Sequence, residues 1–206
     1  MQIIVNDIGI PAWPIGILAL IVTLVLLWRQ KHSWSYLFFF SIFWVYVMSG
    51  LDKAFFPIQI NGQFVDVMRQ TPLTSHINLV PFYLNQQYAL NTIAYINIVQ
   101  NILLTMPFGF GLNFISRIKI RNFLWLSITI GLGIELIQLI ISLLLQYPYR
   151  VIDINDAFLN AIGIIIGYGL FRGFAWLYLT MTHKLKIEHK GLSLYIYEAA
   201  LQEQIR

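Results

Sequence analysis

The sequence of 206 residues contains no cysteine and few charged side chains. Without cysteine the chain can form no disulfide, no thiolate metal site and no lipid-modified cysteine. Charged residues make up 11% of the chain, hydrophobic residues make up 58%, and the mean hydropathy is +0.71. Because a typical soluble domain has about 25% charged residues, this composition predicts an integral membrane protein.

Several familiar functional motifs are also absent from the sequence. It has no Gly-x-Ser-x-Gly elbow, no P-loop and no His-Glu-x-x-His, which excludes the common soluble hydrolase and nucleotide sites. His76 stands apart from the other three histidines, which are His32, His183 and His189. A zinc site needs several such ligands together, so we expect no metal and no cofactor.

Five hydrophobic runs are long enough to cross a bilayer, which needs about 17–25 apolar residues. They are Ile10–Trp28, Trp34–Leu51, Tyr95–Ile115, Phe123–Leu145 and Ala157–Leu179. The sequence therefore predicts an all-α integral membrane protein with about five transmembrane helices. We expect residues 1–206 to form a single membrane domain in the cell membrane.

Positively charged residues are distributed unevenly between the two ends of these runs. One side carries Arg29, Lys31, Arg117, Lys119, Arg121, Lys184, Lys186, Lys190 and Arg206, and the other carries Lys53, Arg69 and Arg150. The positive-inside rule makes the richer side cytoplasmic, so the N-terminus is predicted outside and the C-terminus inside. Residues 180–206 then form a cytoplasmic tail, in which Leu192–Leu201 is expected to be a short helix. The basic pI of about 9.3 is thus an orientation signal, and we expect no nucleic-acid partner.

Residues 52–91, between the second and third runs, form one long predicted outer loop. Its Asn61-Gly62 pair lies between short segments with apolar residues, which is the usual signal for a β-hairpin turn. We interpret this hairpin as structural. Asn78–Phe82 ends the loop, and because Pro81 interrupts helical hydrogen bonding, this segment is expected to be re-entrant or interfacial.

A polar stripe lies at the start of the fifth run, with its members at spacings of three, four, three and four residues. Its members are Asp153, Asp156, Asn160, Gly163 and Gly167. This spacing places all five on one face of a helix. A charged residue in a spanning helix costs about 2.5–3.5 kcal/mol, so the carboxylates are expected to face a partner or a wet cavity. The two glycines are more typical of close helix packing, as are Gly169 and Gly173, within one chain or between two copies.

Two further polar stripes are predicted to lie at a similar depth. Asn97 and Asn101 share a face of the third span, and the fourth span carries Gly131, Glu135, Gln138 and Ser142 on one face. All three stripes are expected to meet in the outer half of the membrane.

Arg150 and Glu135 each allow more than one interpretation. Arg150 can bind an anionic group through its planar guanidinium, or pair with an aspartate at the start of a helix that Asp153 caps. Glu135 can join helices through hydrogen bonds to Gln138 and Asn101. Alternatively, it can accept a proton or take part in a cation or headgroup site with the aspartates.

Four segments, in order and spacing, resemble the VanZ-like family of membrane proteins. They are Asn78–Phe82, Asn101–Phe110, Ile134–Gln138 and the stretch from Arg150 through Asp153, Asp156, Asn160 and Gly163 to Gly167. The resemblance covers about residues 78–170. It implies a Gram-positive cell-envelope protein linked to reduced susceptibility to teicoplanin and other glycopeptide or lipoglycopeptide antibiotics, and it supplies no reaction. Asn155 stands where the family more often has an acid, which weakens the case for a multi-carboxylate metal site.

Three functions are compatible with these residues. The first is binding of a lipid headgroup, a lipid-linked wall precursor or the antibiotic itself. Its candidate ligand-binding residues are Asn78, Asn101, Gln138, Arg150, Asp153 and Asn160. The second is a membrane-embedded enzyme acting on a lipid-linked or phospho-lipid substrate, with Glu135 and Asp156 as acid–base groups and Arg150 stabilising an anion. The third is a small transporter or flippase. We rank binding first and transport last, because the predicted inner halves of the spans offer few polar residues.

Overall fold

The computed structural model of the protein describes residues 9–10, 13–81, 92–116 and 118–204. Its helices are α1 (Trp13–Arg29), α2 (Trp34–Phe55), α3 (Gln63–Arg69), α4 (Thr92–Gly111), α5 (Ile120–Leu145), α6 (Ile154–Leu185) and α7 (Leu192–Gln204), with the 3-10 helices η1 (Leu73–His76) and η2 (Leu112–Phe114). The all-helical prediction is therefore confirmed for these parts of the chain.

Four of the described helices are long and apolar enough to cross a membrane. These are α2, α5, α6 and the helical segment Tyr95–Phe114, which combines most of α4 with η2. The first predicted span is present as α1, a shorter apolar helix of 17 residues. The lengths and composition agree with a membrane protein, and the number of crossings stays a prediction.

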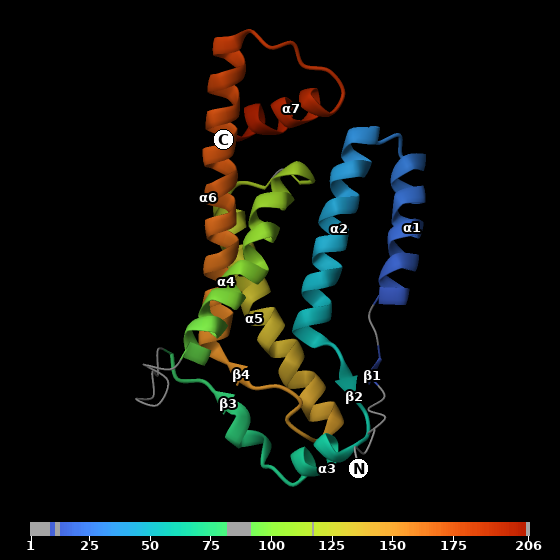
Figure 1. Ribbon diagram of the computed structural model, residues 1–206, viewed down its shortest axis with the longest axis vertical. Helices are drawn as coiled ribbons and strands as arrows, with labels where there is room; N and C mark the ends of the chain where they lie inside the picture. The colour runs from blue at the N-terminus through green and yellow to red at the C-terminus, as the bar shows by residue number, and fades with distance from the viewer. Residues whose placement is uncertain (1–8, 11–12, 82–91, 117, 205–206) are drawn as a thin grey trace.

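The long helices alternate in direction, so the connections gather at two opposite ends of the molecule (Figure 1). We call them the β4 end, which holds β2, α3, β3 and β4, and the α7 end, which holds the α1–α2 connection, η2 and α7. The predicted outer loop lies at the β4 end. The more basic connections lie at the α7 end, although Arg117 and Arg206 fall outside the described residues. Which end faces the cytoplasm stays a prediction from charge.

Helix α6 packs against α4 through glycines that bring the two backbones into direct contact. A methyl group at Gly167 would lie 1.9 Å from the Met106 carbonyl oxygen, and one at Gly109 would lie 1.9 Å from the Ile164 carbonyl oxygen. Gly163 is similarly close to α4. We call Gly109, Gly163 and Gly167 the glycine seam, and it confirms the packing role predicted for the last two.

The other glycines of the sequence pattern behave differently from one another. Gly131 packs α5 against α6, since a methyl group there would lie 2.3 Å from the Ala157 carbonyl oxygen. Gly169 and Gly173 are exposed and face open space within the described structure. The close packing expected at this second pair is therefore not found within the chain.

At the α7 end, helix α7 docks on an aromatic core. Phe114, Phe171, Ala175, Leu179 and Ala200 are the buried members of this core. The Tyr168 hydroxyl donates a 2.5 Å hydrogen bond to the buried Glu203 carboxylate, and Arg172 Nε lies 3.6 Å from the same carboxylate. The short helix predicted at Leu192–Leu201 is confirmed as α7.

The hairpin predicted around Asn61-Gly62 is wrong. Strand β2 (Ile58–Gln59) pairs antiparallel with β1 (Gly9–Ile10), and Gly62 precedes α3 with φ of 110°. Glycine adopts positive φ readily, and here it does so before a helix and not in a hairpin turn. The Asn-Gly signal therefore located a backbone turn correctly but could not identify a strand partner about 50 residues away.

At the same end, β3 (Ile77–Asn78) pairs parallel with β4 (Ile152–Asp153), with Asn78 opposite Asp153. This pairing fixes the end of the outer loop beside the start of α6. Phe82 and residues 83–91 of the predicted loop lie outside the described residues. The structure therefore does not test the re-entrant prediction, and it does show an extended backbone at Asn78.

Candidate ligand-binding cavity

A cavity of about 750 Å³ lies between α2, α4, α5 and the start of α6, toward the β4 end. We call it the polar cavity. It is lined by Tyr46, Ser49, Gly50, Lys53, Ala54, Asn97, Gln100, Asn101, Leu103, Leu104, Ile134, Glu135, Gln138, Arg150, Val151, Asp156 and Asn160. The three predicted stripes thus do meet.

Six of the eight predicted site residues line the polar cavity. They are Asn101, Glu135, Gln138, Arg150, Asp156 and Asn160. Sequence reasoning missed the contribution of α2, where Tyr46, Ser49 and Lys53 recur at spacings of three and four. That spacing places the three residues on one helix face and could have indicated a polar wall. Hydroxyl groups and a lysine near a helix end are, however, also common at a membrane interface.

Asp153 and Asn78, the other two predicted site residues, do not line the cavity. Asp153 is the N-cap of α6, as predicted, and its Oδ1 accepts hydrogen bonds from the Asn155 backbone N–H and side-chain amide, both at 2.8 Å. The same oxygen accepts from Asn78 Nδ2 at 3.1 Å. These contacts tie strand β3 to the start of α6 and so hold the cavity wall in place.

Glu135 is buried in α5, with 7% of its surface exposed. Its Oε2 accepts a 3.0 Å hydrogen bond from the Asp153 backbone N–H. The expected bonds to Gln138 and Asn101 are not formed, because Gln138 Nε2 instead donates to the Ala54 carbonyl oxygen at 3.0 Å. A carboxylate near the N-terminus of α6 is also favoured by the helix dipole.

Arg150 contacts the C-terminal end of α2. One guanidinium nitrogen, Nη2, donates to the carbonyl oxygens of Lys53 at 3.0 Å and Phe56 at 3.1 Å. The predicted pair with Asp153 or Asp156 is wrong, because no Arg150–carboxylate contact within 4.0 Å occurs among the described residues. The last carbonyls of a helix lack partners within it, so they attract a nearby cationic donor.

Asn160 is the most deeply buried polar residue of the cavity lining, with 2% of its surface exposed. Its backbone carbonyl oxygen accepts a hydrogen bond from the Thr105 hydroxyl at 2.8 Å. Its side-chain Oδ1 is buried and has no hydrogen-bond partner among the described residues. A buried acceptor without a partner is uncommon in folded proteins, which makes this atom a candidate contact for a ligand.

A smaller cavity of about 360 Å³ adjoins the polar cavity and shares Arg150 and Val151 with it. Tyr147 and Tyr149 also line it. Burial raises the pKa of both tyrosine hydroxyls above their usual range, and the neighbouring Arg150 charge opposes this shift at Tyr149. Both hydroxyls therefore stay protonated at neutral pH. The Tyr147 hydroxyl donates to the Gln59 carbonyl oxygen, whereas the Tyr149 hydroxyl has no partner among the described residues.

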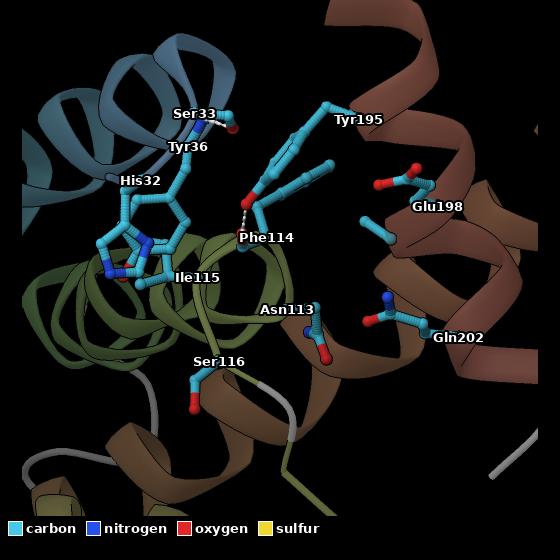
Figure 2. Close-up of a pocket in the computed structure, with 11 residues that line it drawn as sticks. His32, Ser33, Tyr36, Asn113, Phe114, Ile115, Ser116, Tyr195, Glu198 and Gln202 are labelled. Carbon is cyan, nitrogen blue, oxygen red and sulfur yellow. Dashed lines mark hydrogen bonds between the residues drawn. The ribbon is translucent and has the colours of Figure 1, made fainter. Parts of the chain in front are cut away.

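A separate cavity of about 330 Å³ lies at the α7 end, and sequence reasoning did not identify it. Figure 2 shows residues from three segments around it, namely the start of α2, η2 and α7. The Tyr195 hydroxyl closes one wall by donating to the Phe114 carbonyl oxygen. This cavity shares no lining residue with the polar cavity.

No group of three or more His, Cys, Asp or Glu side chains is placed to hold a metal ion in the part of the chain that the structure describes. Glu135 and Asp156 are the two carboxylates of the polar cavity. The lining therefore offers carboxylate, amide and hydroxyl groups for hydrogen bonding and charge pairing.

A family model, VanZ/LLP1, matches residues 37–178 of the chain. The matched segment contains every residue that lines the polar cavity, whereas α1 and α7 lie outside it. Comparisons with curated proteins and with solved structures found no match.

Proposed function

The chain belongs to the VanZ/LLP1 family, and we propose that its polar cavity binds the headgroup of an amphiphile and thereby lowers susceptibility to teicoplanin and related lipoglycopeptides. Three amphiphiles suit this role: a membrane lipid, a lipid-linked cell-wall precursor and the lipoglycopeptide itself. Each combines a polar head with an apolar tail.

The observation that carries this proposal is a large polar cavity inside a bundle with apolar outer faces. Ligand sites typically measure about 300–1,000 Å³, and the polar cavity measures about 750 Å³. Outside it, α5 exposes Leu132, Leu136 and Ile140. An amphiphile can therefore place its head among the polar side chains and its chains along such apolar surfaces.

The predicted topology would put this cavity in the outer leaflet. Lys53, Arg69 and Arg150 are the basic residues predicted on that side, and the positive-inside rule assigns the less basic side to the outside. Wall precursors and glycopeptide antibiotics act outside the cytoplasm, so this placement would bring the cavity to them.

The test makes the cavity lining less polar and measures antibiotic susceptibility. The variant Asn101→Leu/Gln138→Leu replaces two lining amides by apolar side chains, and Val99→Leu, on an exposed face of the same α4, is the control. In a bacterium without its own copy, the control should preserve teicoplanin tolerance. Cells with the double variant, at equal membrane abundance, should match cells that lack the protein. Equal tolerance in both strains would refute the proposal.

A second candidate is a membrane-embedded enzyme. The observation in its favour is that Glu135 and Asp156 line the same cavity as Arg150, which offers acid–base groups beside a cation. Mass spectrometry of native lipids incubated with the purified protein separates the two candidates. An enzyme converts a lipid to a product of different mass and loses this activity in Glu135→Gln, whereas a binder leaves every lipid mass unchanged.

A further inference from the structure

Building on the function proposed above, we propose that the bound headgroup carries a primary ammonium group, held by Glu135, Asp156 and Asn160. These residues belong to the polar cavity. The proposal narrows the ligand from any amphiphile to one whose head donates hydrogen bonds and bears positive charge.

Some hydrogen-bond donors of the cavity lining are already used within the protein. Four lining side chains donate to backbone carbonyl oxygens: Tyr46, Ser49, Gln138 and Arg150. These four side chains are therefore less available to a ligand that needs many donors, such as a bare phosphate. The amides of Asn97, Gln100 and Asn101 also line the cavity, and the exposed Lys53 lies at the end of α2.

The acceptors of the lining are largely unused. Asn160 Oδ1 is buried without a partner, and Asp156 forms no hydrogen bond or ion pair with any described residue. Glu135 engages only Oε2, through the Asp153 backbone N–H. Of these three residues, Asn160 is the one with a buried acceptor that has no partner in the described structure, so a ligand that donates to Asn160 Oδ1 relieves an unfavourable state of the empty cavity.

The three acceptor residues are arranged on two helices. Asp156 and Asn160 are four residues apart on α6, so they share one helix face. Glu135 comes from α5 and is fixed beside the start of α6 by its bond to the Asp153 N–H. A primary ammonium group has three N–H donors, which matches three acceptor residues. Its positive charge also compensates the carboxylates in an enclosed environment.

Other ligand groups fit these residues less well. A metal ion would call for a larger set of ligating side chains than the described structure brings together. An anion would be repelled by Glu135 and Asp156, whereas a phosphate attached to the ammonium-bearing head could contact Lys53. A headgroup with its ammonium beside the two carboxylates, and with any anionic group toward Lys53, pairs with the charges of both parts of the cavity.

An ammonium headgroup can come from two sources, an ethanolamine phospholipid or an amino-sugar amphiphile. Two ligand pairs test them by calorimetric titration of the purified full-length protein. The first compares short-chain phosphatidylethanolamine with phosphatidylcholine of the same chains, and the second compares an alkyl glucosaminide with the matching alkyl glucoside. We expect the primary amine to bind about tenfold tighter in at least one pair. A preference in the first pair identifies a phospholipid source and one in the second an amino-sugar source.

Equal binding within both pairs would overturn the ammonium proposal. Amine-free ligands that bind in the cavity would still support headgroup binding, and the teicoplanin test above would be unaffected. The two proposals therefore fail separately.

Asp156→Asn is the variant that tests the residues themselves. Its side chain has nearly the same shape, and no hydrogen bond to a described residue is lost, so the fold should survive. We expect the amine preference to fall several-fold in this variant and to vanish in Glu135→Gln/Asp156→Asn. Glu188→Gln, at an exposed site beside Lys190, should keep the full preference. An unchanged preference in a folded double variant would contradict the assignment.

Discussion

Helices α4 and α6 meet in two different ways along their length. At the glycine seam, bare backbone lies against bare backbone. Toward the β4 end, the same helices carry Asn101 and Asn160, and there they border the polar cavity. The difference follows from side-chain size and polarity, since glycine permits contact whereas amides leave space that a ligand can enter.

The two regions also differ in how well their polar groups are satisfied. Beside the seam, the Thr105 hydroxyl donates to the Asn160 carbonyl oxygen, and the helices have no gap. In the cavity, Asn160 Oδ1 is left without a partner in the described structure. The seam thus stabilises the fold, and the cavity retains unfavourable features that binding would remove.

Breaking the seam should have the largest effect. Gly167→Leu forces a side chain into a space where even a methyl group would clash with the Met106 carbonyl oxygen. We expect a loss of at least about 3 kcal/mol in stability and little recoverable protein by size-exclusion chromatography. Gly169→Leu, two residues along and facing open space, is the matched control and should behave as wild type. Equal recovery of the two variants would show that the seam is not a tight contact.

Removing the contact between Arg150 and the end of α2 should have a smaller effect on stability. Arg150→Ala loses two hydrogen bonds to the end of α2, and a charged hydrogen bond contributes about 1.5–3 kcal/mol. We expect a clear drop in the thermal midpoint, together with weaker lipid retention. Arg69→Ala, at an exposed site of the same end, should change neither. A midpoint equal to that of wild type would indicate that Arg150 does not hold α2.

Replacing Asn160 in the polar cavity should have the smallest effect on stability, and this effect should be stabilising. Asn160→Leu removes a buried oxygen without a partner, so the empty protein should gain about 1 kcal/mol. The gain would appear as a higher thermal midpoint in delipidated protein, whereas affinity for the amine ligands should fall. A lower midpoint in this variant would show that the Asn160 side chain contributes to folding through contacts of its own.

Local patterns predicted the helices and most of the cavity. The spacing of Asp156 and Asn160 and the position of Glu135 placed polar groups on helix faces that do meet, because helical periodicity is a local property. Asp153 was also recognised as the N-cap, since the cap depends on residues close in sequence.

Partners distant in sequence were not predictable in the same way. Arg150 binds backbone carbonyls of α2, and every residue offers a carbonyl, so composition gives no clue to the choice. Strand β2 pairs with β1 near the N-terminus, and the local Asn-Gly signal could not reveal this. The α2 wall was missed because its polar residues also suit a membrane interface.

The most direct test of headgroup binding is an experimental density map of the full-length protein purified in native lipid. We predict density for a polar head against Asn160 and Asp156, continuous with a chain that leaves the polar cavity along an apolar helix face. A map in which the cavity is collapsed, or contains only water while lipids occupy other surfaces, would contradict headgroup binding.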